Sequence, residues 1–202
     1  MKQLIALLFL TIFISGTALA QDWWVKPSAG ILMADIDDKI VLGDSTDGTL
    51  EGYKGGAGTE MRVSVGVGRL ETSYVLQYYT ADKDGDANVG SSHTKEVGEL
   101  TFVNEMIEVA GYFFDEPIKT GFNISAGGGI GTAKLTLERK FDSVEEVDYD
   151  SYAKIYHYRF SGHYDITDMF GVEFTYRSEN INVAEQASFT NTTMSLLANA
   201  KF

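Results

Sequence analysis

Two histidines and a serine lie close together in the sequence and could carry hydrolytic chemistry. His157, Ser161 and His163 are separated by even numbers of residues, so in a β-strand their side chains share one face. A serine activated by a histidine, which a carboxylate orients, is a recurring constellation for acyl transfer. However, Arg159 falls on the same face, and the chain has no compact His-x-Ser-Asn motif. We therefore expect both histidines to fill space in the interior, and we expect no enzymatic activity.

A glycine-rich stretch, residues 127–131, could suggest a loop that binds phosphate. Such a loop requires a buried parallel strand before it and a helix after it, and the sequence predicts neither. Glycines that face the interior of a narrow barrel make room for bulky neighbours and ease the curvature of the strand. We expect this structural role.

An acidic stretch resembles the start of an EF-hand calcium loop, in which oxygen atoms at alternate positions surround the ion. Asp82, Asp84 and Asp86 have the required spacing. Ala87 replaces the sixth-position glycine, and His93 stands where a bidentate glutamate is required. These aspartates are weak candidates for metal ligands, and the alternative is a solvated acidic loop. We expect no cofactor.

The N-terminus has the features of an export signal. Residues 1–20 combine an early Lys2, an apolar run over residues 4–14 and an Ala-Leu-Ala sequence before Gln21. This pattern predicts a secretory signal peptide cleaved after Ala20. The apolar run is too short to span a membrane comfortably as a helix. Residues 21–202 are then expected to form one domain.

The composition of the rest of the chain favours strands over helices. The 202 residues include 21 glycines, 11 tyrosines and 12 phenylalanines but only two prolines, and no cysteine is present for a disulfide or a lipid anchor. After residue 20 no apolar run reaches the roughly 20 residues of a transmembrane helix. An exported chain of this kind is either a soluble periplasmic domain or a closed barrel. The net charge of −13 argues against binding to nucleic acid.

Alternation of apolar and polar residues predicts eight strands. In residues 60–68, for example, Met61, Val63 and Val65 face one side while Arg62 and Ser64 face the other. The expected strands are residues 24–35, 60–68, 70–81, 99–114, 119–137, 152–164, 170–177 and 187–202. The connections between them are alternately long and short, with polar loops expected at residues 36–56, 82–95, 138–150 and 179–186. Glu105 and Glu108 fall on opposite faces of their strand, which suggests a bulge there.

The terminal strand, residues 187–202, has one apolar face and ends on Phe202. An amphipathic terminal strand that closes on Phe resembles the signal by which bacterial outer-membrane barrels are recognised by the barrel-assembly machinery and inserted. With the Gly-Val-Gly at residues 66–68, the glycines of residues 127–131 and the Phe-Thr-Tyr-Arg at residues 174–177, the mature chain resembles the small eight-stranded outer-membrane proteins of the opacity-protein and OmpA-barrel type. The resemblance implies an all-β, eight-stranded antiparallel up-and-down transmembrane barrel in the outer membrane of a Gram-negative-type bacterium. The resemblance does not extend to the peptidoglycan-binding domain of full-length OmpA, so anchoring to the cell wall is not expected.

A soluble lipocalin-like barrel would show the same alternation with its faces reversed, so alternation alone does not exclude it. The signal peptide, the terminal Phe and aromatic residues near the strand ends favour the membrane barrel. Short turns and both termini then lie on the periplasmic side. The aromatic girdle expected at that interface comprises Trp23, Trp24, Tyr112, Phe114, Phe122, Tyr164, Phe170 and Phe202.

Eight strands enclose a space that side chains can fill, and charged residues fall on its inner face. We expect Arg159 to pair with Glu173, and Arg62 to join Glu108 or Glu71, because a lone charge in a confined interior is costly. The whole expected lumen network is Arg62, Glu71, Glu108, Arg159, Glu173 and Arg177.

Three functions remain open for such a scaffold, because a fold does not fix a function. The first is a structural or surface-interaction protein that acts through acidic outer loops; the second is a narrow channel for small solutes; the third, less favoured, is an enzyme acting on outer-leaflet lipid. The expected surroundings are outer-membrane lipid and lipopolysaccharide. Acidic loops also favour divalent cations or a cationic surface partner.

Overall fold

The computed structural model describes residues 23–36, 39–41, 49–51, 55–89, 92–114, 121–141, 144–183 and 187–202. The predicted signal peptide, residues 1–20, lies outside these ranges, so the cleavage site and the domain boundary stay predictions. Within the described residues, no helix has the length and hydropathy needed to cross a membrane.

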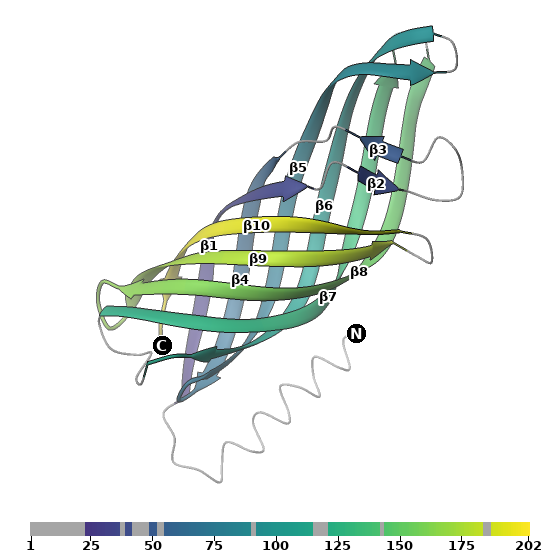
Figure 1. Cartoon of the computed structure of the whole chain (residues 1–202). Coiled ribbons are helices and arrows are strands. Elements are labelled where there is room, and N and C mark those ends of the chain that lie inside the picture. Colours follow the sequence, from purple (N-terminus) through teal and green to yellow (C-terminus); the bar gives the residue numbers. More distant parts are fainter. Residues whose placement is uncertain are drawn as a thin grey trace.

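Eight long antiparallel strands close into a barrel in the order β1-β10-β9-β8-β7-β6-β5-β4 (Figure 1). The predicted fold class, an all-β barrel of eight antiparallel strands, is confirmed. The strands are β1 (Trp23–Ile36), β4 (Gly56–Val67), β5 (Leu70–Val89), β6 (Ser92–Tyr112), β7 (Gly121–Phe141), β8 (Val144–Asp165), β9 (Phe170–Val183) and β10 (Ala187–Ala200). A separate two-stranded hairpin, β2 (Lys39–Val41) and β3 (Thr49–Glu51), lies within the stretch expected to be only a loop.

The pairing register shows that the strands are tilted. From Trp23 of β1, the partners followed once around the barrel lead back to Met33 of the same strand, a stagger of ten residues. Strands must tilt to accommodate such a stagger, and eight of them leave an interior that side chains can fill.

The faces of the barrel are inverted relative to a soluble protein. On β4, Arg62 and Ser64 are buried in the interior, whereas Met61 and Val63 are 58% and 48% exposed on the outside. The same alternation gives β8 an outer row of Tyr156, Tyr158 and Phe160. Apolar residues arranged around the outside of a barrel need lipid rather than water as their solvent.

Both ends of the described barrel sequence meet at one end of the barrel, which we call the base. The backbone of Phe202 exchanges two hydrogen bonds with Val25 of β1, at 2.9 and 3.0 Å. The two connections at the base that the structure describes in full are short, residues 68–69 and residues 166–169. Between β4 and β5 the turn consists of Gly68 and Arg69, and Gly68 has a φ of 54°, which glycine adopts without steric cost.

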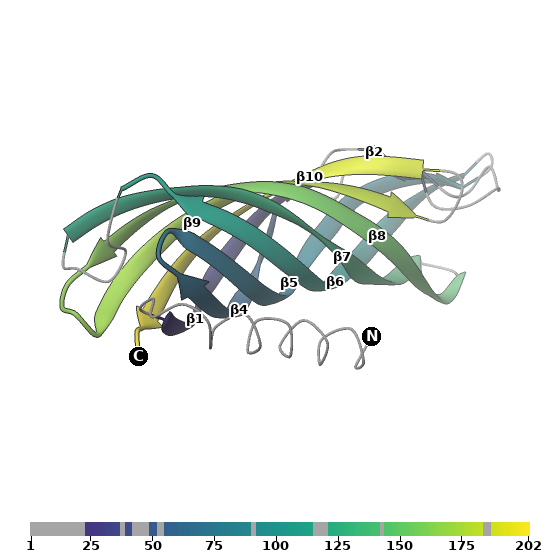
Figure 2. The ribbon, with the colours of Figure 1, turned by 90° about the horizontal axis from the view of Figure 1, so that it is seen from below.

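At the opposite end four strands continue beyond the others. β4 pairs with β5 only as far as Thr80, but β5 and β6 pair out to Val89 and Ser92, and β7 and β8 pair out to Phe141 and Val144. These strands form the tall wall at the upper right of Figure 1, and Figure 2 shows the same elongation from below. We call the part of β5–β8 that lies farther from the base than Thr80 of β5 and Ala153 of β8 the extension.

The extension overturns the prediction of long loops at residues 82–95 and 138–150. Backbone pairing in a sheet does not require apolar side chains, and where both faces of a sheet meet water the apolar alternation that marks a strand disappears. The last predicted loop is also too long at its start, because β9 continues to Val183 and Glu179 is buried inside the barrel.

Two smaller predictions are also wrong. No bulge is present near Glu105 and Glu108, because β6 keeps one register with both neighbours there; Glu105 simply faces outward. Trp24 and Tyr112 do not join the girdle at the base, because they point inward and pack edge to face with ring centroids 5.9 Å apart. Adjacent residues of a strand face opposite sides, so only Trp23 of the Trp pair could lie outside. The remaining six girdle residues are exposed at the base: Trp23, Phe114, Phe122, Tyr164, Phe170 and Phe202.

Candidate functional site

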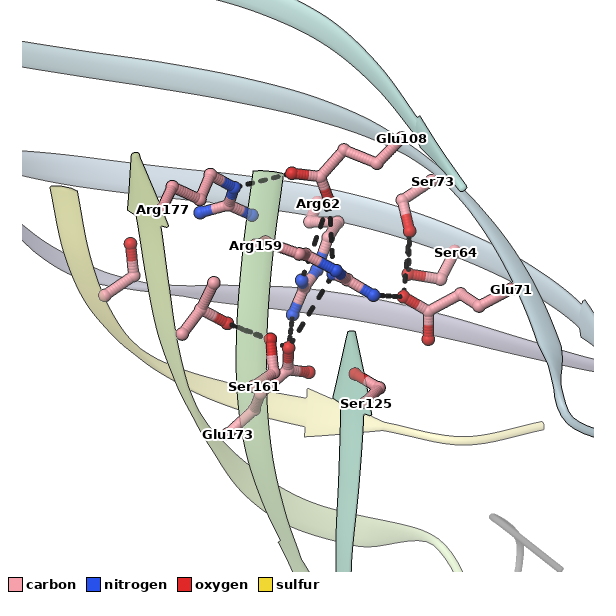
Figure 3. Close-up of polar contacts among 12 residues, drawn as sticks. Arg62, Ser64, Glu71, Ser73, Glu108, Ser125, Arg159, Ser161, Glu173 and Arg177 are labelled. Atoms are coloured by element: carbon pink, nitrogen blue, oxygen red, sulfur yellow. Dashed lines mark hydrogen bonds and ion pairs between the residues drawn. The ribbon is translucent and has the colours of Figure 1, made fainter. Parts of the chain in front are cut away.

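A network of charged side chains fills the half of the barrel nearer the base. Its centre consists of Arg62, Arg159 and Arg177, all of them almost completely buried. Figure 3 shows these three arginines converging with Glu71, Glu108 and Glu173 from strands on opposite sides of the barrel. The structure therefore brings all six residues of the expected lumen network together.

The partners of Arg159 differ from those expected. Its guanidinium lies 2.5 Å from Glu71 Oε1 and 3.1 Å from Glu108 Oε2, but 3.9 Å from Glu173 Oε1. The expected pair with Glu173 is thus the longest of the three contacts. Stagger around the barrel explains this, because residues equally far from their strand ends on neighbouring strands are not at equal depth.

Arg62 occupies the position next to Glu173 instead. Its Nη2 forms an ion pair with Glu173 Oε1, while its Nη1 lies 4.0 Å from Glu108 Oε2. Arg177 donates from Nε to Glu108 Oε1 at 2.5 Å and from both Nη atoms to Glu60 at 2.7 and 2.9 Å. The two-point contact with Glu60 matches the planar shape of both groups.

Two members of the network were not predicted from the sequence. Besides Glu60, Lys26 lies 2.9 Å from Glu71 Oε2 and 3.2 Å from Glu173 Oε2, and it also contacts the hydroxyl of Tyr112 at 2.7 Å. Lys26 shares its strand face with Trp24, which was expected to face outward, so strand parity gave no signal that Lys26 faces the lumen. The four basic side chains and four glutamates of this network therefore balance one another in charge. Glu179, which is also buried inside the barrel, accepts hydrogen bonds from Asn191 and Thr193.

A serine, a histidine and a glutamate are hydrogen-bonded in the order of a catalytic triad. Ser125 Oγ lies 2.8 Å from His163 Nε2, and His163 Nδ1 lies 3.1 Å from Glu173 Oε2. Ser125 is completely buried and Glu173 is held by Arg62 and Lys26. A nucleophile must be reachable by the bond that it attacks, so this arrangement orients side chains within the network.

The other two residues singled out for hydrolysis, His157 and Ser161, also face the interior. His157 Nε2 lies 3.0 Å from Glu108 Oε1, and Ser161 shares a 3.0 Å hydrogen bond with Thr175. The sequence thus identified the correct face, but the histidine that contacts a serine does so with Ser125 on β7, which only the pairing of β7 with β8 brings near.

The half of the interior farther from the base is apolar, which the sequence analysis did not anticipate. Tyr79 and Phe102 stack with ring centroids 4.7 Å apart, and Phe189 packs edge to face on Phe102 at 6.3 Å. Buried residues from all of the long strands except β4 complete this apolar plug: Leu32, Ala34, Ile36, Val75, Ala81, Leu100, Met106, Ala133, Leu135, Leu137, Ala153, Ile155, Ile181 and Val183. These apolar residues occupy the inward positions of the strands, and their apolar character at the end far from the base was the signal that could have revealed the plug.

The two remaining candidate stretches lie in regular strands. Gly127 and Gly129 are inside β7, where a Cβ would come within 2.2 Å of Val109 O and 2.1 Å of Ile107 O, so close strand packing accounts for both glycines. Asp82, Asp84 and Asp86 lie in β5, not in a loop. An extended backbone does not wrap around an ion as an EF-hand loop does. Among the side chains that the structure describes, no group of three or more His, Asp or Glu residues could hold a metal ion.

No known protein-family model matches the chain, and no curated protein matches it in sequence. Solved structures do match. The crystal structure of Ail, the attachment invasion locus protein of Yersinia pestis, in complex with the heparin analogue sucrose octasulfate has a TM-score of 0.56 at 10% identity, covering 90% of this chain and 99% of Ail. Neisserial surface protein A gives 0.56 at 13% identity, covering 89% and 97%. The outer membrane protein OprG from Pseudomonas aeruginosa gives 0.59 at 11% identity, covering 90% and 97%.

The chain has the fold of the small eight-stranded outer-membrane β-barrels. This agrees with the resemblance that the terminal strand and the strand pattern indicated. Together with the apolar outer face, it supports the expected location in the outer membrane of a Gram-negative-type bacterium. In outer-membrane barrels the short turns and both termini face the periplasm, so we expect the base at the periplasmic end and the extension outside the cell.

Proposed function

We propose that this outer-membrane barrel is a surface-interaction protein whose acidic extension binds cationic partners. The observation that carries the proposal is the extension itself, four paired strands that hold an acidic sequence away from the membrane. Its acidic residues are Asp82, Asp84, Asp86, Glu96, Glu99, Glu138, Glu145, Glu146, Asp148 and Asp150. A surface with one dominant sign of charge attracts and steers partners of opposite charge.

Pairing of these strands gives the backbone of the acidic stretches a fixed register. Asp82, Asp84 and Asp86 follow one another at alternate positions of β5. Like charges this close in the sequence are stabilised by a cationic ligand or by divalent cations, which can also bridge them to the phosphates of lipopolysaccharide. Ail was crystallised with sucrose octasulfate, a heparin analogue; the acidic extension of this chain favours ligands of the opposite charge.

The other two functions receive less support. A channel would need water along its axis, whereas the lumen holds a neutralised charge network below an apolar plug. An enzyme would need a reachable nucleophile, and Ser125 is buried.

Binding to a cationic polymer tests the proposal. Wild-type protein in nanodiscs is expected to bind polylysine but not heparin, and binding should weaken as salt screens the charges. A variant with Asp82, Asp84 and Asp86 changed to Asn should bind polylysine about tenfold more weakly. Asp168→Asn, which removes an exposed acid at the base, is the control and should bind as wild type does. Equal polylysine binding by all three proteins would contradict the proposal.

A further inference from the structure

One glutamate in the interior has hydrogen-bond donors around it but no cationic partner. Glu179 on β9 is completely buried. It accepts hydrogen bonds from three neutral groups, namely Thr193 Oγ1 at 3.0 Å, Asn191 Nδ2 at 3.0 Å and Asn104 Nδ2 at 3.5 Å. Among the side chains that the structure describes, no lysine or arginine forms an ion pair with its carboxylate. An ionised carboxylate is costly to bury in this state.

The charges inside the barrel do not balance once Glu179 is included. The described buried cations are Lys26, Arg62, Arg159, Arg177 and Lys201, and the described buried acids are Glu60, Glu71, Glu108, Asp165, Glu173 and Glu179. With neutral histidines, these five positive and six negative charges leave a net charge of −1 in the interior. Every acid of this set except Glu179 lies in an ion pair. The excess negative charge therefore belongs to Glu179.

A histidine lies opposite this carboxylate. Glu108, Gly129, His157 and Glu179 follow one another in a single pairing row across β6, β7, β8 and β9. Gly129 leaves room for the imidazole, because a Cβ there would lie 2.8 Å from His157 Cε1. His157 Nε2 thereby comes within 3.0 Å of Glu108 Oε1, while its Nδ1 has no hydrogen-bond partner among the described residues. An imidazole protonated on both nitrogens carries one positive charge, which is the charge that the interior lacks.

A proton suits this place better than a metal ion does. Ile181 and Val183, the next inward residues of β9, belong to the apolar plug. A hydrated ion would have to cross that plug, or the ion-paired network on the other side, and then displace the groups that already contact the carboxylate. A proton needs no cavity. The other described inward histidine, His163, is a poorer site, because its partner Glu173 already contacts Arg62 and Lys26.

We infer that His157 and Glu179 form a proton-binding site, and that the folded barrel holds one proton on this pair at neutral pH. The charged or titratable groups around the pair are Glu60 of β4, Tyr79 of β5, Glu108 of β6, Arg159 of β8 and Arg177 of β9. Its inward neighbours on β7 and β10 are uncharged. Arg177 directs its donors at Glu108 and Glu60, so it does not replace the proton. The inference is independent of the role proposed for the extension, because it concerns the interior.

The proton count determines how stability depends on pH. In the unfolded chain a glutamate is ionised above about pH 4.3, and a histidine is neutral above about pH 6.5. Above about pH 6.5 the unfolded pair therefore binds no proton, whereas the folded pair binds one, whichever of the two residues carries it. Stability falls with rising pH wherever the folded state binds more protons than the unfolded state. One proton corresponds to about a tenfold change in the unfolding equilibrium constant per pH unit.

Urea-induced unfolding in lipid vesicles at pH 7 and pH 8 tests the inference. Glu179→Gln keeps the shape of the side chain but needs no proton. We expect the unfolding equilibrium constant of the wild type to rise about tenfold more over this pH unit than that of Glu179→Gln. Glu138→Gln, which alters an exposed acid on β7, is the matched control and should follow the wild type. Folding in weakly buffered solution at pH 8, followed with a pH indicator, should show one more proton taken up by the wild type than by Glu179→Gln.

Equal pH dependence of the wild type and Glu179→Gln would overturn the inference. So would a wild-type stability that follows the concentration of sodium or calcium and not the pH, since a metal ion would then supply the missing charge. If Glu179→Gln does not fold, the wild type decides the question alone. Folding of the wild type at pH 8 without net uptake of a proton would contradict the inference.

Discussion

The central charges inside this barrel are tolerable because Glu71, Glu108 and Glu173 each contact more than one cationic side chain. Glu173 contacts Arg62, Lys26 at 3.2 Å and Arg159 at 3.9 Å. Removing one partner from a buried ion pair leaves an uncompensated charge, which costs far more than the pair itself contributes. The lumen network is therefore best tested by deleting single members.

We expect Glu173→Ala to lower the free energy of unfolding by about 3 kcal/mol. The loss is smaller if water enters and solvates the abandoned Arg62 and Lys26. Urea-induced unfolding in lipid vesicles measures this, with Glu138→Ala, an exposed acid on β7, as the control. If both variants unfold at the wild-type urea concentration, the network does not contribute to stability.

The hydrogen-bonded Ser125, His163 and Glu173 provide a second test at this scale. Because Ser125 Oγ is buried and no reacting carbonyl can approach it, we expect no labelling by a fluorophosphonate that reacts with activated serines. A serine hydrolase treated in parallel is the positive control. Labelling of the wild type that disappears in Ser125→Ala would revive the enzymatic hypothesis.

At the scale of the elements, the apolar plug joins seven of the eight long strands at the extracellular half of the interior. Phe102 is completely buried between Tyr79 and Phe189. Truncating it leaves a cavity that the surrounding strands cannot close without losing their register.

Phe102→Ala should therefore lower the free energy of unfolding by about 3 to 5 kcal/mol, the usual range for a buried aromatic. Tyr152→Ala removes an aromatic that is 70% exposed on the outer face of β8, and its effect should stay within about 0.5 kcal/mol. The same vesicle unfolding assay compares them, and similar losses in both variants would argue against a packed plug.

The terminal strand carries the prediction for assembly. Phe202 is 71% exposed at the base, and its backbone closes the barrel against Val25. Deleting Phe202 removes an interfacial aromatic together with the final residue of the expected insertion signal, so we expect the truncated protein not to reach the outer membrane. Membrane fractionation and heat-modifiable gel mobility measure this. Normal amounts of folded truncated protein would remove the support for an insertion role.

For the whole molecule, the two layers of the interior predict a closed barrel. An ion would have to cross the apolar plug and then displace the paired arginines and glutamates. We expect planar bilayers to show no large, steady conductance from the wild type. A steady conductance that is unchanged by Arg159→Ala or Glu173→Ala would favour the channel.

The sequence alone determined the strands within the membrane, their inward and outward faces except at Trp24 and Tyr112, and the inward position of the six residues expected in the lumen network. These features follow from alternation with a period of two, which a chain displays locally wherever one face meets lipid and the other meets the interior. For the same reason Arg62 and Arg159 could be assigned inward without knowledge of their partners.

Tertiary structure decided which carboxylate meets which arginine, because the stagger around the closed barrel sets depth and no local pattern encodes it. It also decided that β5–β8 continue beyond the membrane, where pairing is made by backbone groups and the side-chain pattern is lost. The contact of His163 with Ser125 arises in the same way, because it joins residues of different strands that only the register of a closed sheet brings together.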